Sequence, residues 1–206
     1  MLFTPLQTDR LTLRPYSLSD IPALLPLIGA REVAATTLRI PHPYTDSDAR
    51  NFIAGTQESL LGGSELRLGI VWRESGALCG GVGLRIEADH RRAELGYWIG
   101  VPYWGKGYAT EASRALVDYG FGTLGLRRIF ASHFANNPAS ARVLRKIGMR
   151  HEGSLRAHVL KWGEFIDLEM YGMVGSDVER TLNTSLQVTE KVRRRYPTPK
   201  GAFDFR

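Results

Sequence analysis

The chain has 206 residues, of which 43% are hydrophobic and 23% charged, an ordinary composition for a globular protein with one sizeable core. Its single cysteine, Cys79, excludes an intrachain disulfide framework, and no apolar run approaches the roughly 18 residues needed to cross a bilayer. The sequence therefore predicts a cytoplasmic protein without membrane contact. The net charge of +6 is uneven, because basic residues gather on one expected helix and near the end of the chain.

Hydrophobic spacing predicts the elements of the first part of the chain. They are a strand over 6–14, a helix capped by Ser19 or Asp20 and closed by Gly29, an irregular segment over 31–44, and a helix over 46–61. Pro41 and Pro43 break regular structure in the irregular segment, and Gly62-Gly63 stops the second helix.

The remaining elements begin with three strands in meander order. The full set is strands over 65–73, 77–86 and 92–99, a helix over 110–121, a strand over 128–134, a helix over 137–147, and an antiparallel pair over 150–161 and 165–174. Asn137 can cap its helix, Pro138 suits the first helical position, and Gly148 stands just past its end. This order predicts an α/β fold in which helices cover a mixed sheet.

A glycine-rich turn between the strand over 92–99 and the following helix is the most informative feature. Gly105 and Gly107 lack a Cβ, so the backbone can adopt positive φ and approach a ligand closely. The helix that follows points free N–H groups and its positive dipole end at the same place. The turn therefore predicts a site for a phosphate or pyrophosphate group.

Two nucleotide-type patterns compete for this turn. Gly100 to Lys106 fits the start of a P-loop, but Gly107 stands where that motif needs Ser or Thr for Mg²⁺. The segment from Trp104 to Ala109 reads x-x-x-G-x-A and resembles the acyl-CoA pyrophosphate loop of the GNAT acetyltransferase superfamily, although Trp104 replaces its usual Arg or Gln. The Trp-Gly-x-Gly form followed by Ala-Thr-Glu-Ala resembles the RimJ/RimL branch.

A second segment strengthens this resemblance. Asn137-Pro-Ala-Ser140, followed by Leu144, Lys146, Gly148 and Met149, is similar to the GNAT signature N-x-x-S-x-x-x-L-x-K-x-G-F, with Met at the last position. The resemblance covers residues 6 to 174. It implies a GNAT-like mixed, mostly antiparallel sheet flanked by helices, with a splayed parallel strand pair at the acyl-CoA site.

The resemblance also implies acetyl-CoA as the cosubstrate, with no metal. The cofactor arm would pair with the end of the strand over 92–99, as an added strand does. The cofactor-binding residues that it implies are Trp98, Ile99, Val101, Trp104, Gly105, Lys106, Gly107, Tyr108, Ala109, Thr110, Asn137 and Lys146.

Two residues are candidates for acid–base chemistry in direct transfer through a ternary complex. Glu94 is the predicted general base for the acceptor amine; the alternative is a strand-end glutamate paired with Arg91 or Arg92. Ser140 is the predicted proton donor to the CoA sulfur, and the alternative is a serine that bonds only the backbone of a first helical turn. The aromatic residues Tyr97, Trp98, Tyr103 and Trp104 are interpreted as core or pocket wall, and the five histidines have no metal-ligand spacing.

These features predict an N-acetyltransferase that moves an acetyl group to a primary amine, either a protein N-terminal α-amine or a small amine. The alternatives are a catalytically weak acyl-CoA-binding sensor and a ribosome-associated basic protein. Residues 1–174 would form the catalytic domain, and 175–206 a docked basic extension that packs through residues such as Leu182 and Phe203. Homodimerisation and contact with a ribosomal protein or the ribosome stay open.

Overall fold

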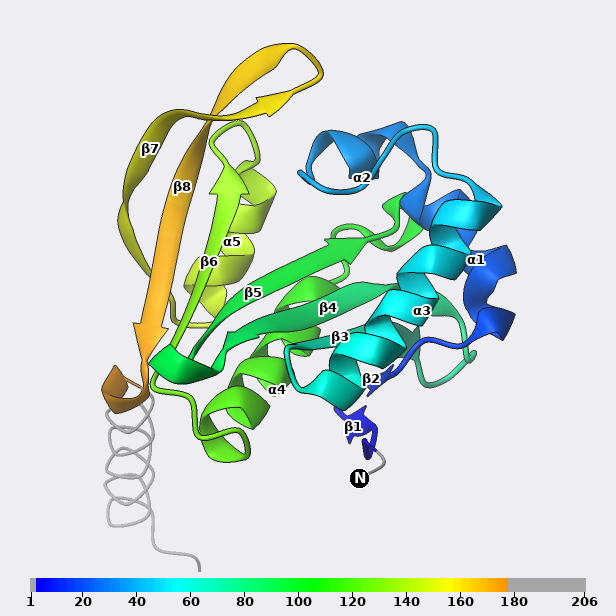
Figure 1. The fold of residues 1–206 in the computed structure, drawn as a ribbon, viewed down its shortest axis with the longest axis horizontal. Helices are drawn as coiled ribbons and strands as arrows, with labels where there is room; N and C mark the ends of the chain where they lie inside the picture. The colour runs from blue at the N-terminus through cyan, green and yellow to red at the C-terminus, as the bar shows by residue number, and fades with distance from the viewer. Residues whose placement is uncertain (1–2, 178–206) are drawn as a thin grey trace, which may run out of the picture. The chain divides into compact units, whose positions relative to one another are not determined.

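The computed structural model describes residues 3–177 of the chain. Within this range, eight strands form one sheet in the order β1-β2-β3-β4-β5-β6-β8-β7 (Figure 1). The strands are β1 Leu6–Gln7, β2 Leu11–Arg14, β3 Glu65–Trp72, β4 Leu78–Glu87, β5 Arg92–Ile99, β6 Arg128–Phe134, β7 Arg150–Lys161 and β8 Glu164–Val174. The β5–β6 pair is parallel, whereas the β1–β2, β2–β3, β3–β4, β4–β5 and β7–β8 pairs are antiparallel. The predicted mixed, mostly antiparallel sheet is confirmed.

Helices cover both faces of this sheet (Figure 1). The α-helices of the described residues are α1 Ile21–Ile28, α2 Arg31–Ala35, α3 Asp46–Gly62, α4 Tyr108–Gly122 and α5 Pro138–Lys146. Helices α1 and α3 pack on one face against β4 and β3, while α4 packs on the other face against β4 and β5, with α5 beside it on β6. Short 3-10 turns cover Leu18–Asp20, Ala88–His90 and Val101–Tyr103.

Most predicted elements are confirmed to within two residues, and two are wrong. The strand expected over 6–14 is interrupted: β1 and β2 pair with each other as a hairpin around residues 8–10. The turn forms because the Thr8 side chain accepts from the Leu11 amide at 2.9 Å, so a local polar bond replaces continued extension. The segment 31–44 also contains the short helix α2, which ends well before Pro41.

The sheet divides the core into two layers. On the α1 and α3 face, the buried cluster consists of Tyr16, Ile21, Leu24, Ile28, Ala49, Ile53, Val71 and Leu78. On the α4 face, Leu84, Leu116 and Ile129 are buried. Gly120 lets α4 approach the sheet, since a Cβ at this position would meet Ile129 Cδ1 at 2.8 Å. Both layers fix β4 and β5, the strands that carry the site.

Residues up to Met173 form one compact unit, and the chain from Val174 onward belongs to a second. The predicted basic extension over 175–206 lies almost wholly outside the described residues, so its docking stays a prediction. In the described range, no helix is long and apolar enough to cross a membrane.

An ion pair joins the end of β2 to the start of α1. Arg14 donates to both carboxylate oxygens of Asp20, at 2.8 and 2.7 Å, and the Ser17 amide donates to the same group at 2.8 Å. Burial opposes ionisation of Asp20, but the bonds from Arg14 and Ser17 outweigh it and hold the Asp20 pKa below its ordinary value. This pair therefore stabilises the fold fully above the ordinary carboxyl range, and the stabilisation is lost as pH falls through the folded-state pKa.

The substitution Asp20→Asn is expected to lower the free energy of unfolding by about 1–3 kcal/mol at neutral pH, because Arg14 loses a charged partner. The difference should begin to shrink below the ordinary carboxyl pKa of about 4 and continue to shrink as pH falls through the lower folded-state pKa of Asp20. Urea unfolding at neutral and at acidic pH measures it. Asp46→Asn is the control, because it removes an exposed pair with Arg50 that contributes less than about 1 kcal/mol. Equal losses in the two variants would contradict this account.

Candidate active site

The site begins where two parallel strands separate. Strands β5 and β6 pair only at Arg92–Arg128, Ala93–Ile129 and Glu94–Phe130. Beyond that point β5 continues to Ile99 and β6 to Phe134 without a further paired position. The predicted splay is therefore confirmed, and it opens a gap in the middle of the sheet.

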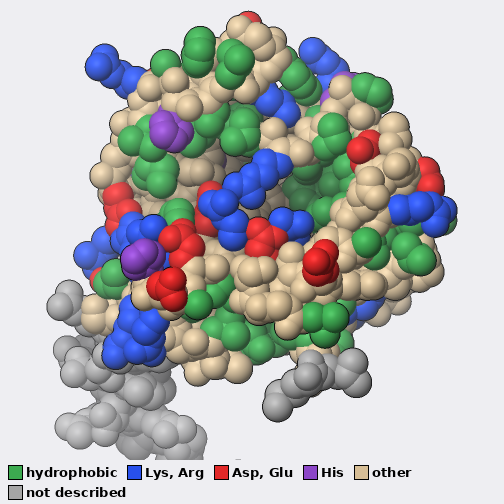
Figure 2. All heavy atoms as spheres, viewed as in Figure 1, with side chains coloured by type: hydrophobic (Ala, Val, Ile, Leu, Met, Phe, Trp, Pro, Cys, Tyr) green, Lys and Arg blue, Asp and Glu red, His purple; other side chains and the backbone are tan. Residues whose placement is uncertain are grey.

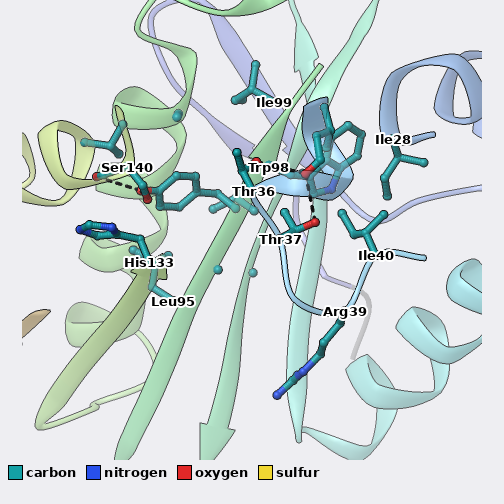
Figure 3. A pocket seen from close by; sticks show the side chains of 18 of the residues that line it. Ile28, Thr36, Thr37, Arg39, Ile40, Leu95, Trp98, Ile99, His133 and Ser140 are labelled. Carbon is teal, nitrogen blue, oxygen red and sulfur yellow. Dashed lines mark hydrogen bonds between the residues drawn. The ribbon is translucent and has the colours of Figure 1, made fainter. Parts of the chain in front are cut away.

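One cavity of about 1030 Å³ lies at this gap. It is lined on one side by the glycine turn, α4 and α5, and on the other by the segment between α2 and α3 and by α3. Figure 3 shows Ser140 and His133 on the first side, with Ile28 and Ile40 on the second. Because a single cavity reaches both sides, two ligands can meet in it.

Most of the predicted site residues line this cavity. They are Glu94, Trp98, Ile99, Trp104, Gly105, Gly107, Tyr108, Ala109, Thr110, Asn137, Ser140 and Lys146. Val101 and Lys106 are outside the lining; the Lys106 ammonium lies 5.3 Å from the centre of the Tyr103 ring. The cavity gathers the two sequence motifs, whereas the binding and catalytic roles of these residues stay predictions.

The glycine turn has the predicted backbone. Gly105 and Gly107 adopt φ of +75° and +82°, which favours glycine, and Gly107 is the N-cap of α4. The helix begins earlier than expected, at Tyr108, and its first intrahelical bond runs from the Glu111 amide to the Gly107 carbonyl at 3.1 Å. The amides of residues 108–110 precede that bond, so they can bind an anion at the turn.

The β1–β2 turn braces this glycine turn from outside. Glu111 accepts from the Thr8 hydroxyl at 2.7 Å, from the Arg10 amide at 2.9 Å and from the Arg10 guanidinium at 2.8 Å. Arg10 also donates to the Lys106 carbonyl at 3.1 Å. Burial opposes ionisation of Glu111, but these bonds prevail and lower its pKa. The glycine turn is therefore held in position by residues about a hundred positions earlier in the chain.

Charged side chains differ between the two sides of the cavity. On the α5 side, Arg142 and Lys146 line it, which favours an anionic ligand. On the other side, Arg39, Arg67 and Arg85 line it together with Asp48, Glu65 and Glu94. Figure 2 shows basic and acidic side chains around a hollow in the middle of the face that is turned to the viewer. The second side therefore has equal numbers of basic and acidic side chains.

Trp104 closes the end of β5. Its indole N–H donates to the Ile99 carbonyl at 2.6 Å, while 46% of the residue stays exposed. The departure from the usual Arg or Gln at this position therefore has a structural use, because the indole satisfies a strand-end carbonyl beside the gap.

Glu94 has a partner that differs from the sequence alternative. It forms an ion pair with Arg85, its neighbour across the β4–β5 ladder, and neither Arg91 nor Arg92 is that partner. Arg92 pairs with Glu87 at 2.7 Å, and Arg91 donates to the Gly125 carbonyl. The Glu94 carboxylate lines the cavity but is already engaged by a guanidinium.

Ser140 has both local and distant contacts. Its amide donates to Asn137 Oδ1 at 3.2 Å, as expected for a capped first turn, and its Oγ lies 2.6 Å from the Tyr97 hydroxyl. Burial raises the pKa of Tyr97 to about 12, so this phenol stays protonated and can donate. Sequence reasoning interpreted Tyr97 as pocket wall and missed this pair, since no local signal connects residues 43 positions apart.

The metal-ligating and thiol groups of the described residues bear on the chemistry of the site. In residues 3–177 no group of three or more His, Cys, Asp or Glu side chains could hold a metal ion. Cys79 is buried, and burial raises the pKa of its thiol, which weakens it as a nucleophile. Transfer between two bound ligands fits this arrangement better than a covalent acyl carrier.

Comparisons with known proteins bear on the family and the fold of the chain. The family model for the acetyltransferase (GNAT) domain matches residues 10–150. The "Uncharacterized N-acetyltransferase p20" of Bacillus licheniformis is 36% identical over 171 residues, which cover 82% of this chain and 95% of the relative. The "Putative ribosomal N-acetyltransferase YdaF" of Bacillus subtilis is 35% identical over 50% of this chain and 57% of its own length.

The architecture also matches a solved structure. RimL, described as a ribosomal L7/L12 alpha-N-protein acetyltransferase in complex with coenzyme A, superposes with a TM-score of 0.76 at 21% identity. The match covers 83% of this chain and 98% of RimL. At this identity the likeness supports the fold.

The substitution Gly107→Val is expected to weaken coenzyme A binding at least about tenfold, because valine is strained at φ +82° and crowds the approach to the helix amides. Strain alone costs about 1–3 kcal/mol of stability. Gly63→Val is the matched control: Gly63 adopts φ +71°, and a Cβ there meets nothing within 4 Å. Calorimetry should give weaker binding for the first variant alone, with similar falls in melting temperature. Equal affinities would contradict the anion site.

Proposed function

The chain belongs to the GNAT acetyltransferase family, and we propose that it transfers an acetyl group from acetyl-CoA directly to the N-terminal α-amine of a protein. As an acyl-CoA-dependent N-acetyltransferase with RimJ/RimL-like neighbours, it needs a place where a thioester and an amine meet. The observation that carries the proposal is the single cavity that reaches both sides of the β5–β6 gap.

The donor side of this cavity fits acetyl-CoA. The Gly105 and Gly107 turn and the first amides of α4 would hold the pyrophosphate, and Arg142 and Lys146 would add positive charge. Asn137 is the N-cap residue of α5 and lines the cavity. The thioester would supply the acyl group, while this chain supplies position, charge and proton transfer.

Ser140 and Tyr97 together would protonate the departing sulfur. If the Tyr97 phenol donates to Ser140 Oγ, at 2.6 Å, the serine hydrogen is free to point into the cavity. The single phenol hydrogen has a second acceptor in the Ser140 carbonyl, 3.2 Å from the Tyr97 hydroxyl, and when it goes there the serine hydroxyl donates to the phenol instead. Glu94, ion-paired with Arg85, stays the base predicted from the sequence and would at least attract an ammonium group to the gap.

The acceptor side favours a singly charged amine over a polyamine. A polycation needs an excess of acidic side chains, whereas Arg39, Arg67 and Arg85 balance the three acids of this wall. Ile28, Ile40 and Tyr44 add apolar surface to the same side. These features support the α-amine of a polypeptide, and the names of YdaF and RimL point in the same direction. The proposal includes three further points. The protein would form a homodimer, take a ribosomal protein as its substrate and contact the ribosome.

A panel of amines with acetyl-CoA tests the function. Release of the CoA thiol should be fastest with peptides that have a free N-terminus, much slower with spermidine, and absent with N-terminally blocked peptides. Lysine-free peptides confine the reaction to the α-amine. Binding of acetyl-CoA without thiol release from any amine would instead support the sensor alternative. Faster release with spermidine would contradict the choice of acceptor.

Variants of the hydroxyl pair test the proton donor. Ser140→Ala should lower kcat by about 10²-fold with little change in acetyl-CoA affinity, because the sulfur leaves without a proton. Tyr97→Phe should give a smaller loss, since Ser140 Oγ keeps its hydrogen but loses its partner. Tyr119→Phe, on α4, is the matched control. Changes below about threefold in both test variants would leave the pair structural.

A further inference from the structure

His133, on β6, has a buried ring nitrogen without a partner. The residue is only 7% exposed, and its Nδ1 lies 2.8 Å from the Phe134 carbonyl oxygen. A carbonyl only accepts hydrogen bonds, so Nδ1 carries the hydrogen and the neutral ring has its lone pair on Nε2. Nε2 is buried without a hydrogen-bond partner among the described residues. A buried acceptor of this kind is costly unless a ligand supplies a donor.

The ring faces the cavity at the level of the hydroxyl pair. The parallel ladder ends at Glu94–Phe130, and Tyr97 and His133 each lie three residues beyond it, about 10 Å along their strands. Both line the cavity, and Figure 3 shows His133 beside Ser140. The hydroxyl pair and His133 therefore border the same part of the gap.

Glu94 is less well placed for proton transfer. It lies at the last paired position of β5 and β6, before the two strands separate, and Arg85 already forms an ion pair with its carboxylate. Among residues 3–177, His133 Nε2 has no hydrogen-bond partner.

We infer that His133 is a catalytic residue whose Nε2 accepts a proton from the acceptor amine during acetyl transfer. The inference rests on the proposed function, and it assigns the general base to His133 in place of Glu94. Imidazole suits this task because its charge changes nearest to neutral pH among ordinary side chains.

The proton balance of the reaction is complete with these groups. The acceptor arrives as R–NH₃⁺ and passes one proton to His133 Nε2, which leaves a nitrogen lone pair. That lone pair forms the C–N bond as the C–S bond breaks, and the sulfur takes a proton from the Ser140 and Tyr97 pair. The nitrogen loses its second proton on becoming an amide, and this proton restores the hydroxyl pair. His133 releases its proton to water, so one proton is produced in each turnover.

Other titrating groups surround the ring and bear on any pH profile. Tyr171 of β8 packs against His133 with ring centres 5.5 Å apart, and His151 of β7 contacts the same tyrosine. Glu169 of β8 interacts electrostatically with His133 and bonds His151. On the cavity side, Tyr97 of β5 is the neighbouring acid. The test must therefore separate His133 from His151 and Glu169.

The discriminating variant is His133→Asn, whose amide can keep the bond to the Phe134 carbonyl while Nε2 is removed. It should lower kcat/KM for a peptide α-amine by about 10²-fold at neutral pH, and the loss should diminish at high pH, where the amine deprotonates unaided. Glu94→Gln should lower it less than about tenfold, and His90→Gln, on an exposed turn, should leave it unchanged. His151→Gln should retain the wild-type pH profile. Wild-type turnover in a folded His133→Asn would overturn the inference.

A second measurement does not depend on turnover. Nitrogen-15 NMR of the wild-type protein should show the neutral His133 ring protonated at Nδ1, and a ring protonated at Nε2 would overturn the inference even if every variant misfolds. If the wild-type protein releases no thiol with any amine, the proposed function itself fails. The ring-tautomer result then still decides whether His133 has its lone pair on Nε2.

Discussion

The loss of pairing between β5 and β6 after Glu94 and Phe130 is the constraint on which the site depends. Backbone polar groups that leave a ladder must find other partners or face a ligand. One of them has another partner: the Ile99 carbonyl, at the end of β5, accepts from the Trp104 indole. The remaining edge borders the cavity, so the defect in the sheet is also its functional opening.

The two helices beside the gap contribute different kinds of chemical group to it. Helix α4 brings a backbone site, in which glycine geometry and free amides favour an anion. Helix α5 brings side chains, because its capped first turn orients Ser140 towards Tyr97. Anion binding and proton transfer are thus assigned to different elements, and the sheet between them sets their separation. This division explains how the gap can hold a large donor while chemistry takes place at one end.

Local signals were sufficient for most of the elements and for the glycine turn. The positive φ of Gly107 and the cap at Asn137 follow from residue type and short spacing, and both could be predicted from the sequence. Contacts between distant residues could not. The pairing of Glu94 with Arg85 depends on the β4–β5 register, and the contact of Tyr97 with Ser140 depends on how α5 packs against β5. The break in the first strand was also missed, because its turn combines the local bond between Thr8 and Leu11 with bonds to Glu111, far along the chain.

The brace formed by Thr8, Arg10 and Glu111 has a consequence for where the working unit begins. Similarity to the family model starts at residue 10, yet the bond from Thr8 to Glu111 comes from before that point. A shortened protein that starts at the edge of recognisable similarity would keep every motif residue and still lack a support of the cofactor turn. The hydrogen bonds that support the site therefore begin at Thr8, upstream of residue 10, where similarity to the family model begins.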